Sequence, residues 1–250
     1  MTISTATTTT SPSRAPLAGF AVQLVLLAVL AVYSGLSSWG WVAGVAFGAV
    51  LCGLLHRAAL PALGWANMVT FGRAILTGGV FALVASAASG TVVPAALLVT
   101  IAAVALAMDG VDGQVARRTG TSSAFGARFD MEVDAFLILV LSVSAALEYG
   151  WWALAIGAFR YLFVAASWAL PWLNAALPPR FGRKVVAAQQ GVMLAVVVSG
   201  LLPAWLAIAA LAVALGSLTW SFGRDIAWLY QASRVRHSAR SRWSAQLVTQ

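Results

Sequence analysis

Eight apolar stretches, each close to 20 residues long, make up most of this chain. A helix needs roughly 20 consecutive apolar residues to cross the hydrocarbon core of a bilayer. Within hydrocarbon every backbone polar group needs a partner, and a helix supplies those partners from its own segment. We therefore predict an all-α fold, a polytopic membrane helical bundle of about eight transmembrane helices. The predicted spans are residues 16–35, 39–55, 67–88, 91–108, 131–148, 151–173, 184–202 and 204–229.

Composition excludes a water-soluble domain. Only 9% of the 250 residues are charged and 61% are hydrophobic, with a mean hydropathy of +0.90, whereas a soluble domain has roughly 25% charged residues. Lys and Arg number 15 against 7 Asp and Glu. Loops facing an anionic leaflet explain this excess better than nucleic acid, because no soluble basic module is visible. The single cysteine, Cys52, lies in an apolar stretch and excludes an intrachain disulfide framework.

Thirteen of the 15 Lys and Arg residues lie in or beside alternate connections between the predicted spans. The turns near 36–38, 89–90, 149–150 and 200–203 contain no Lys or Arg. Because positive loops remain on the cytoplasmic side, we predict a multi-pass cell-membrane protein with both termini and residues 109–130 in the cytoplasm. The 13 basic residues of the other connections are Arg14, Arg57, Arg117, Arg118, Arg128, Arg180, Arg183, Lys184, Arg224, Arg234, Arg236, Arg240 and Arg242.

The chain divides into four predicted parts. Residues 1–15 form a Ser/Thr/Pro-rich disordered head, and residues 16–57 form a transmembrane hairpin. The main membrane domain covers 58–230, and a basic tail at 231–250 lies on anionic lipid. The first span follows a basic residue, as a signal peptide would. It lacks a clear small-x-small cleavage site and is followed closely by a second span, which favours a retained helix.

Three glycines in the second span recur every fourth residue, at Gly40, Gly44 and Gly48. This spacing lets another helix approach closely. Packing within the protein and a contact in a homodimer explain the pattern equally well.

Four aspartates near the predicted cytoplasmic boundary carry the chemistry. Carboxylates in or beside a membrane are costly and usually functional. Their spacing places them on two helical stripes that also carry small residues, which leaves room for a ligand. The first stripe is Asp109, Asp112, Gly113 and Ala116, and the second is Gly126, Asp130 and Asp134.

Four carboxylates brought together would carry a charge of −4 and would repel one another. Two divalent cations would cancel that charge, and oxygen-only ligands favour Mg²⁺, Mn²⁺ or Ca²⁺ over zinc. Paired cations of this kind recur where phosphoryl groups are transferred. Capping of helix N-termini could explain one or two of these aspartates but not both stripes.

The segment from Asp109 to Asp134 resembles the signature of the CDP-alcohol phosphotransferase (CDP-alcohol phosphatidyltransferase) family, D-x-x-D-G-x-x-A-R-x8-G-x-x-x-D-x-x-x-D, at every fixed position. The family's six-helix layout would cover residues 67 to about 230 and leave the first two helices as an addition. Asn67, Thr70 and Arg73 are similar to an N-x-x-T-x-x-R element that precedes the signature. A helix cap by Asn67 and a snorkelling Arg73 remain an alternative explanation.

The resemblance implies a role for each matched residue. Asp134 would be the general base and a metal ligand. The implied metal ligands are Asp109, Asp112, Asp130 and Asp134, which would hold Mg²⁺ or Mn²⁺, two ions in all. The implied donor-binding residues are Gly113, Ala116, Arg117, Gly126, Asn67, Thr70 and Arg73. Candidate acceptor-binding residues are Arg160, Arg180, Arg183 and Lys184, although the positive-inside rule explains the last three equally well.

The implied reaction moves a phosphatidyl group from CDP-diacylglycerol to a hydroxyl acceptor and releases CMP, as in phospholipid biosynthesis. Glycerol 3-phosphate is the first choice of acceptor, because several basic residues could offset a second phosphate. Inositol phosphate follows, then serine, or a diglyceride acceptor with a small CDP-alcohol donor. A cation-coupled transporter is an alternative of another class, but it predicts inverted repeats, and no second matching half is found. A catalytically dead scaffold would not need intact aspartates.

Overall fold

The computed structural model describes residues 14–57, 65–119, 124–178 and 180–248. Within these helices, the side chains of 14–15, 65–66, 111–119, 124 and 235–248 lie outside the description. The described residues contain no strand, in agreement with the predicted all-α fold. The elements are α1 (Arg14–Ser34), α2 (Ser38–Arg57), α3 (Trp65–Ala88), α4 (Ala95–Thr119), α5 (Ala124–Tyr149), η1 (Trp151–Ala153), α6 (Leu154–Ala169), η2 (Pro171–Asn174), α7 (Phe181–Val198) and α8 (Ala204–Val248).

The eight described α-helices lie close to the eight predicted spans, and six of them are long and apolar enough to cross a membrane. The other two are α4 and α5. In α4 the apolar part is the shorter segment Ala95–Gly110, and α5 carries acidic residues at both ends. The two helices that fall short of the criterion are therefore the ones whose ends carry the aspartates.

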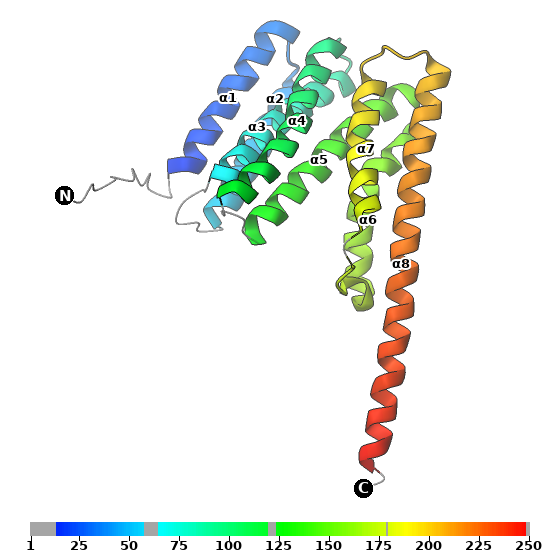
Figure 1. Cartoon of the computed structure of the whole chain (residues 1–250). Helices are drawn as coiled ribbons and strands as arrows, with labels where there is room; N and C mark the ends of the chain where they lie inside the picture. The colour runs from blue at the N-terminus through cyan, green and yellow to red at the C-terminus, as the bar shows by residue number, and fades with distance from the viewer. Residues whose placement is uncertain (1–13, 58–64, 120–123, 179, 249–250) are drawn as a thin grey trace, which may run out of the picture.

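The helices run alternately up and down, so that α2, α4 and α6 end where α3, α5 and α7 begin, at one end of the bundle (Figure 1). We call this the charged end, because Arg57, Arg128 and Arg180 lie there. The short turns gather at the opposite end. All four of these turns contain a glycine at positive φ: Gly35 at 63°, Gly90 at 89°, Gly150 at 103° and Gly200 at 69°. Positive φ lets the chain leave a helix, and glycine adopts it without a steric penalty.

Helix α3 is the centre of the first half of the bundle. It contacts α1, α2, α4 and α5, and 67% of its span Asn67–Ala88 is buried, twice the share of any other candidate span. Helix α5 links this half to α6 and α7, and α7 packs on α8. Residues on α3 and α5 are therefore held from several sides.

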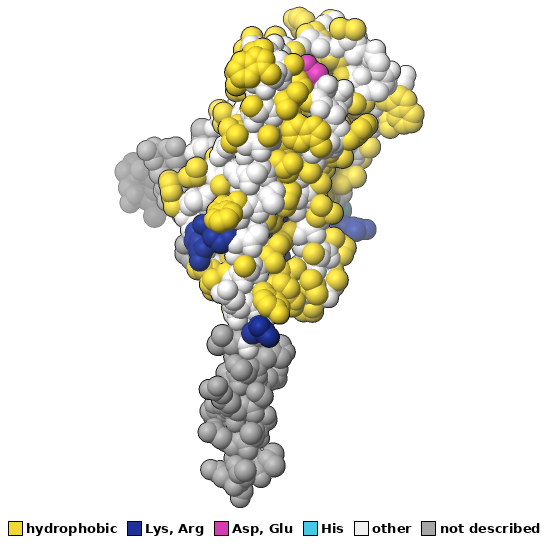
Figure 2. All heavy atoms as spheres, turned by 90° about the vertical axis from the view of Figure 1, so that its right-hand side faces the viewer, with side chains coloured by type: hydrophobic (Ala, Val, Ile, Leu, Met, Phe, Trp, Pro, Cys, Tyr) yellow, Lys and Arg dark blue, Asp and Glu magenta, His cyan; other side chains and the backbone are white. Residues whose placement is uncertain are grey.

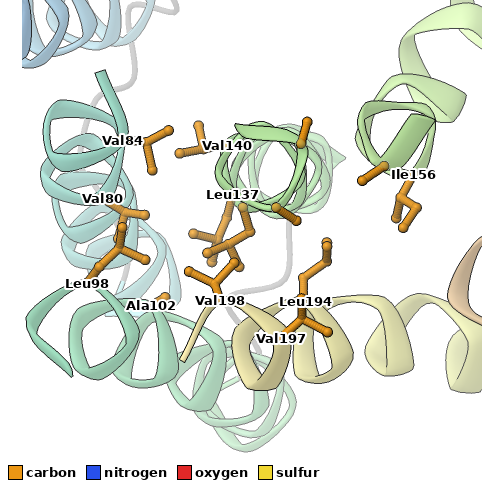
Figure 3. Close-up of a cluster of buried hydrophobic side chains, with 14 of the residues drawn as sticks. Val80, Val84, Leu98, Ala102, Leu137, Val140, Ile156, Leu194, Val197 and Val198 are labelled. Carbon is orange, nitrogen blue, oxygen red and sulfur yellow. The ribbon is translucent and has the colours of Figure 1, made fainter. Parts of the chain in front are cut away.

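The main core joins α3, α4, α5, α6, α7 and α8. Figure 3 shows part of it, where buried side chains of α3 to α7 meet between the helices. Aliphatic residues at helical spacing supply it, as expected for helices that pack along one stripe. The labelled members are Val80, Val84, Leu98, Ala102, Leu137, Val140, Ile156, Leu194, Val197 and Val198.

The glycines of α2 let this helix pack closely on both α1 and α3. A Cβ atom added at Gly44 would lie 2.5 Å from Leu27 on α1, and one at Gly40 would lie 2.0 Å from the Ser86 hydroxyl on α3. All three glycines of the predicted stripe are buried. The structure therefore explains this stripe by packing within the protein.

A second apolar cluster lies where the hairpin meets α3 and α5. It contains Leu51 and Leu55 from α2, Phe71 and Ile75 from α3, and Val133 from α5. Its α3 and α5 members are sequence neighbours of Arg73 and Asp134, so the hairpin supports the helices that carry the charged residues.

Helix α8 continues to Val248, well past the predicted end near residue 229. Its C-terminal half projects beyond the rest of the bundle (Figure 1). On the face of the molecule shown in Figure 2, hydrophobic side chains dominate, and the visible Lys and Arg side chains lie toward the end from which α8 projects. The predicted disordered head falls almost entirely outside the described residues, while the predicted tail is helical to Val248.

Candidate metal centre

Three of the four signature aspartates converge at the charged end of the bundle. Asp109 lies on α4, and Asp130 and Asp134 lie one turn apart on α5. One carboxylate oxygen from each can be chosen so that all three lie within 4.8 Å of one another. Their side chains are 44%, 32% and 34% exposed, respectively. Divalent ions can therefore reach them from one side.

The chain path explains this convergence. Helices α4 and α5 are consecutive, and the aspartates lie near the end of one and near the start of the next. Residues four apart on a helix share a face, so Asp130 and Asp134 point the same way. Asp112 is three residues after Asp109 on α4, which places it on the same face of the helix, but its side chain lies outside the described residues.

Arg73 on α3 contacts this aspartate cluster from the interior of the bundle. Its side chain is completely buried, and Nη1 donates to Asp109 Oδ1 at 2.5 Å. Nη2 donates to Asp130 Oδ1 and to the Asp130 backbone carbonyl, and it lies 3.2 Å from Asp134 Oδ1. One guanidinium thus bridges three helices through all three carboxylates.

Sequence reasoning assigned Arg73 to the donor and did not foresee these contacts. A charge inside an apolar span needs a partner, and four aspartates were predicted at the same end of the bundle. Those two observations together could have indicated the pairing. A contact between Arg73 and the donor stays a prediction.

The other predicted donor residues are only partly placed. Asn67 and Thr70 are buried on the face of α3 that carries Arg73, since their spacing is close to one helical turn. Gly126 is partly buried, four residues before Asp130. The side chains of Gly113, Ala116 and Arg117 lie outside the described residues, so their roles stay predictions.

The predicted acceptor residues lie apart from the aspartate cluster's contacts. Arg160 on α6 pairs with Glu132 on α5, two residues from Asp130 and therefore on a different face of the helix. Arg183 on α7 pairs with Asp225 on α8, with 3.0 Å between Nε and Oδ2. These two arginines are 34% and 35% exposed, so each retains access to solvent or ligand.

Asp225 is a charged residue that sequence reasoning did not single out. It is buried on α8, next to Arg224 in the sequence, and a buried acid in a membrane bundle needs a cationic partner. Arg183 also donates through Nη2 to the Pro178 carbonyl at 3.0 Å. Of the remaining basic candidates, Arg180 immediately precedes α7 and is half-buried, and Lys184 is exposed.

The aspartate cluster fits a divalent metal ion. It offers only carboxylate oxygens, the ligands that Mg²⁺ and Mn²⁺ prefer, from side chains partly open to solvent. The opposing Arg73 offsets only part of the negative charge. This region can therefore hold a divalent cation against the phosphates of a substrate.

The chain belongs to the CDP-alcohol phosphatidyltransferase family, because the model of that family matches residues 63–218, well over half of the chain. The match begins just before α3 and covers the entire aspartate signature. No curated protein and no solved structure matches this chain. The family transfers phosphate-containing groups in phospholipid biosynthesis, and it uses a CDP-alcohol donor, an alcohol acceptor and a divalent metal. The members of this family are transferases, which is a different class from the cation-coupled transporter considered as an alternative.

Proposed function

We propose that this protein transfers a phosphatidyl group from CDP-diacylglycerol to the hydroxyl of a polar acceptor, with glycerol 3-phosphate as that acceptor. The observation that carries the proposal is the convergence of Asp109, Asp130 and Asp134 at one end of a membrane bundle. Family membership supplies the reaction class. The product would be phosphatidylglycerophosphate, and CMP would be released.

Asp109, Asp112, Asp130 and Asp134 would hold the divalent ions. Two bound ions would supply charge stabilisation for the attacking and leaving oxygens of the displacement. The three described carboxylates are partly exposed on the side away from Arg73, which is the side from which ions and substrate phosphates would approach.

Asp134 would act as the general base. Its carboxylate takes the proton of the acceptor hydroxyl while the acceptor oxygen forms a bond to the β-phosphorus of the donor. The bond from that phosphorus to the oxygen of CMP breaks, and CMP leaves with the electron pair. Asp134 lies one turn further along α5 than Asp130, and its side chain is 34% exposed, so an acceptor hydroxyl could reach its carboxylate.

The donor nucleotide would lie along the small residues of the signature. Gly113, Ala116 and Gly126 leave room for a close approach to the helix backbones, and Arg117 would contact the pyrophosphate. Asn67 and Thr70 would line the same end of α3, where both are buried.

The basic residues around the start of α7 support a phosphorylated acceptor. Arg180, Arg183 and Lys184 lie within five residues, and α7 packs against both α4 and α5. Arg183 and Arg160 each already have one acidic partner. An acceptor phosphate would therefore join an ion pair as an additional ligand, and Lys184 would supply charge without such a partner among its described contacts.

The positive-inside rule supports a cytoplasmic active site. Arg57 ends α2, Arg128 lies near the start of α5 and Arg180 precedes α7, which is the end of the bundle where the aspartates of α4 and α5 lie. We accordingly place the protein in the cell membrane with both termini in the cytoplasm. A cytoplasmic site would meet water-soluble acceptors directly.

An acceptor panel tests the proposal. Purified protein would receive labelled CDP-diacylglycerol with glycerol 3-phosphate, inositol phosphate, serine or a diglyceride, and the lipid product would be identified. We expect product and CMP with glycerol 3-phosphate. Product with another acceptor alone would overturn the acceptor assignment, and no CMP release with any acceptor would count against the reaction class.

A further inference from the structure

Arg73 is completely buried and has three carboxylate neighbours. These contacts indicate a role for Arg73 other than binding the donor. A buried guanidinium is costly unless it is paired and hydrogen-bonded. Here the partners come from two other helices, Asp109 from α4 and Asp130 and Asp134 from α5. The arginine therefore ties α3 to the two metal-ligand helices.

The described ion pairs of Arg73 include the Oδ1 atom of each of the three carboxylates. A carboxylate has two oxygens and can accept hydrogen bonds and bind metal at the same time. The guanidinium approaches from the buried side, while each aspartate remains about a third or more exposed. Arginine and a divalent ion can thus engage the same three side chains from opposite sides.

Arg73 belongs to a buried stretch of α3. Its neighbours Ala74 and Ile75 are buried, and Thr77 Oγ1 donates to its backbone carbonyl at 2.9 Å. Because the guanidinium stays charged at every relevant pH, its positive charge is permanent. Any divalent ion must bind beside that charge.

We propose that Arg73 is the internal cation of the metal centre: it keeps the three carboxylates together when no divalent ion is bound, and its charge lowers the affinity of the centre for divalent ions. This inference rests on the proposed metal-dependent function. Three carboxylates at this range repel one another strongly. Arg73 relieves that repulsion in advance, so an ion gains less by binding.

Removing the charge separates the effects of the arginine and the ion. In Arg73→Met the aspartates would repel one another until an ion binds, and the ion would then relieve the full repulsion. The repulsion that the ion relieves on binding adds to the free energy of binding, and therefore raises the affinity for the ion. The full-length variant should therefore bind Mn²⁺ about tenfold or more tightly than the unmodified protein, since one charge at close range is worth at least a decade in affinity.

The test measures Mn²⁺ binding by calorimetry and thermal melting in detergent, with chelator and with Mn²⁺. We expect Arg73→Met to melt lower than the unmodified protein in chelator and to gain more from Mn²⁺. Arg73→Lys keeps the charge and loses the forked geometry, so it should melt lower in chelator but bind Mn²⁺ with nearly unchanged affinity. Equal or weaker Mn²⁺ binding by Arg73→Met would overturn the inference, as would tenfold tighter binding by Arg73→Lys.

A double variant covers the case in which Arg73→Met does not fold. Arg73→Met with Asp130→Asn removes one charge of each sign, so it should fold in chelator if carboxylate repulsion was the cause. Failure of the double variant as well would assign Arg73 a packing role and overturn the inference. If the unmodified protein itself binds no Mn²⁺, the proposed function fails, whereas a failure of the inference leaves that binding intact.

Discussion

Arg73 lies near the start of α3 and Arg183 near the start of α7, both toward the charged end of the bundle, but their surroundings differ. Arg73 is fully buried and contacts three carboxylates from two helices. Arg183 is about one-third exposed and contacts Asp225 alone among the described acids, and Arg160 is in a similar position with Glu132. The first arginine is a fixed part of a charged centre, while the other two form single ion pairs that an anionic ligand can still reach.

This difference separates two regions of the molecule. Around α3, α4 and α5 the negative charges outnumber the positive, so the region attracts cations. The described part of α6, α7 and α8 has one acidic residue, Asp225, which pairs with Arg183, and the exposed Lys184 adds further positive charge. If donor and acceptor both carry phosphate, the donor phosphates would meet metal ions held by the first region. The acceptor phosphate would meet the basic side chains of the second region.

Removal of divalent metal is the most severe test of the aspartate region. In chelator, CMP release from CDP-diacylglycerol should fall to background, because the carboxylates alone repel the donor phosphates. Mg²⁺ or Mn²⁺ should restore release. Turnover that persists in full chelator would mean that the aspartates do not work through metal ions.

Asp134→Asn should have the next largest effect. Loss of a general base typically reduces turnover by about 10²–10⁴-fold, and the variant also loses a metal-ligand charge. CMP release would be compared with that of Glu148→Gln, a change near the opposite end of the same helix, with folding checked by thermal melting. Near-normal turnover in Asp134→Asn would remove this residue from the role of base.

Arg183→Ala combined with Lys184→Ala tests the basic region. If these residues bind the acceptor phosphate, the acceptor KM should rise by roughly tenfold or more, as expected for the loss of a charge-assisted hydrogen bond, and the donor KM should change little. Steady-state kinetics with each substrate varied in turn would measure both. An equal rise in the two KM values would contradict a phosphorylated acceptor.

Glu132→Gln should have the smallest effect. The Glu132 side chain is 55% exposed and Arg160 is 34% exposed, so the free Arg160 can be solvated, and the free energy of unfolding should change by less than about 1 kcal/mol. Thermal melting in chelator measures this, with Arg73→Met as the contrasting variant. If Glu132→Gln lost as much stability as Arg73→Met, the buried Arg73 and the partly exposed Arg160 would depend equally on their acidic partners, which would contradict the comparison.

Local pattern predicted much of the fold. Apolar runs near 20 residues long fall in α1 to α8, because a bilayer requires helices of that length. The boundaries were less accurate where polarity changes gradually. Helix α8 passes residue 229 without a break because its basic continuation is compatible with helix, and no proline or glycine ends it. The predicted span to residue 173 ends instead at Ala169, one residue before η2 and its Pro171.

Pairings between distant residues could not be predicted in the same way. The sequence places Asp109 and Asp112 on one helical face and Asp130 and Asp134 on another, because that requires only the helical period. It does not indicate that Glu132 points to α6, nor that Asp225 approaches Arg183. Both depend on which helices are neighbours.

Amino-acid order by itself determined that this chain is a helical membrane protein with an aspartate signature at its charged end. The length of an apolar run and the spacing of residues along a helix are local features, so they can be recognised without knowing which helices pack together. Tertiary structure alone decided which cation faces the aspartates. Arg73 lies 36 residues from Asp109 and 57 from Asp130, and only the packing of α3 between α4 and α5 brings these charges within hydrogen-bonding distance.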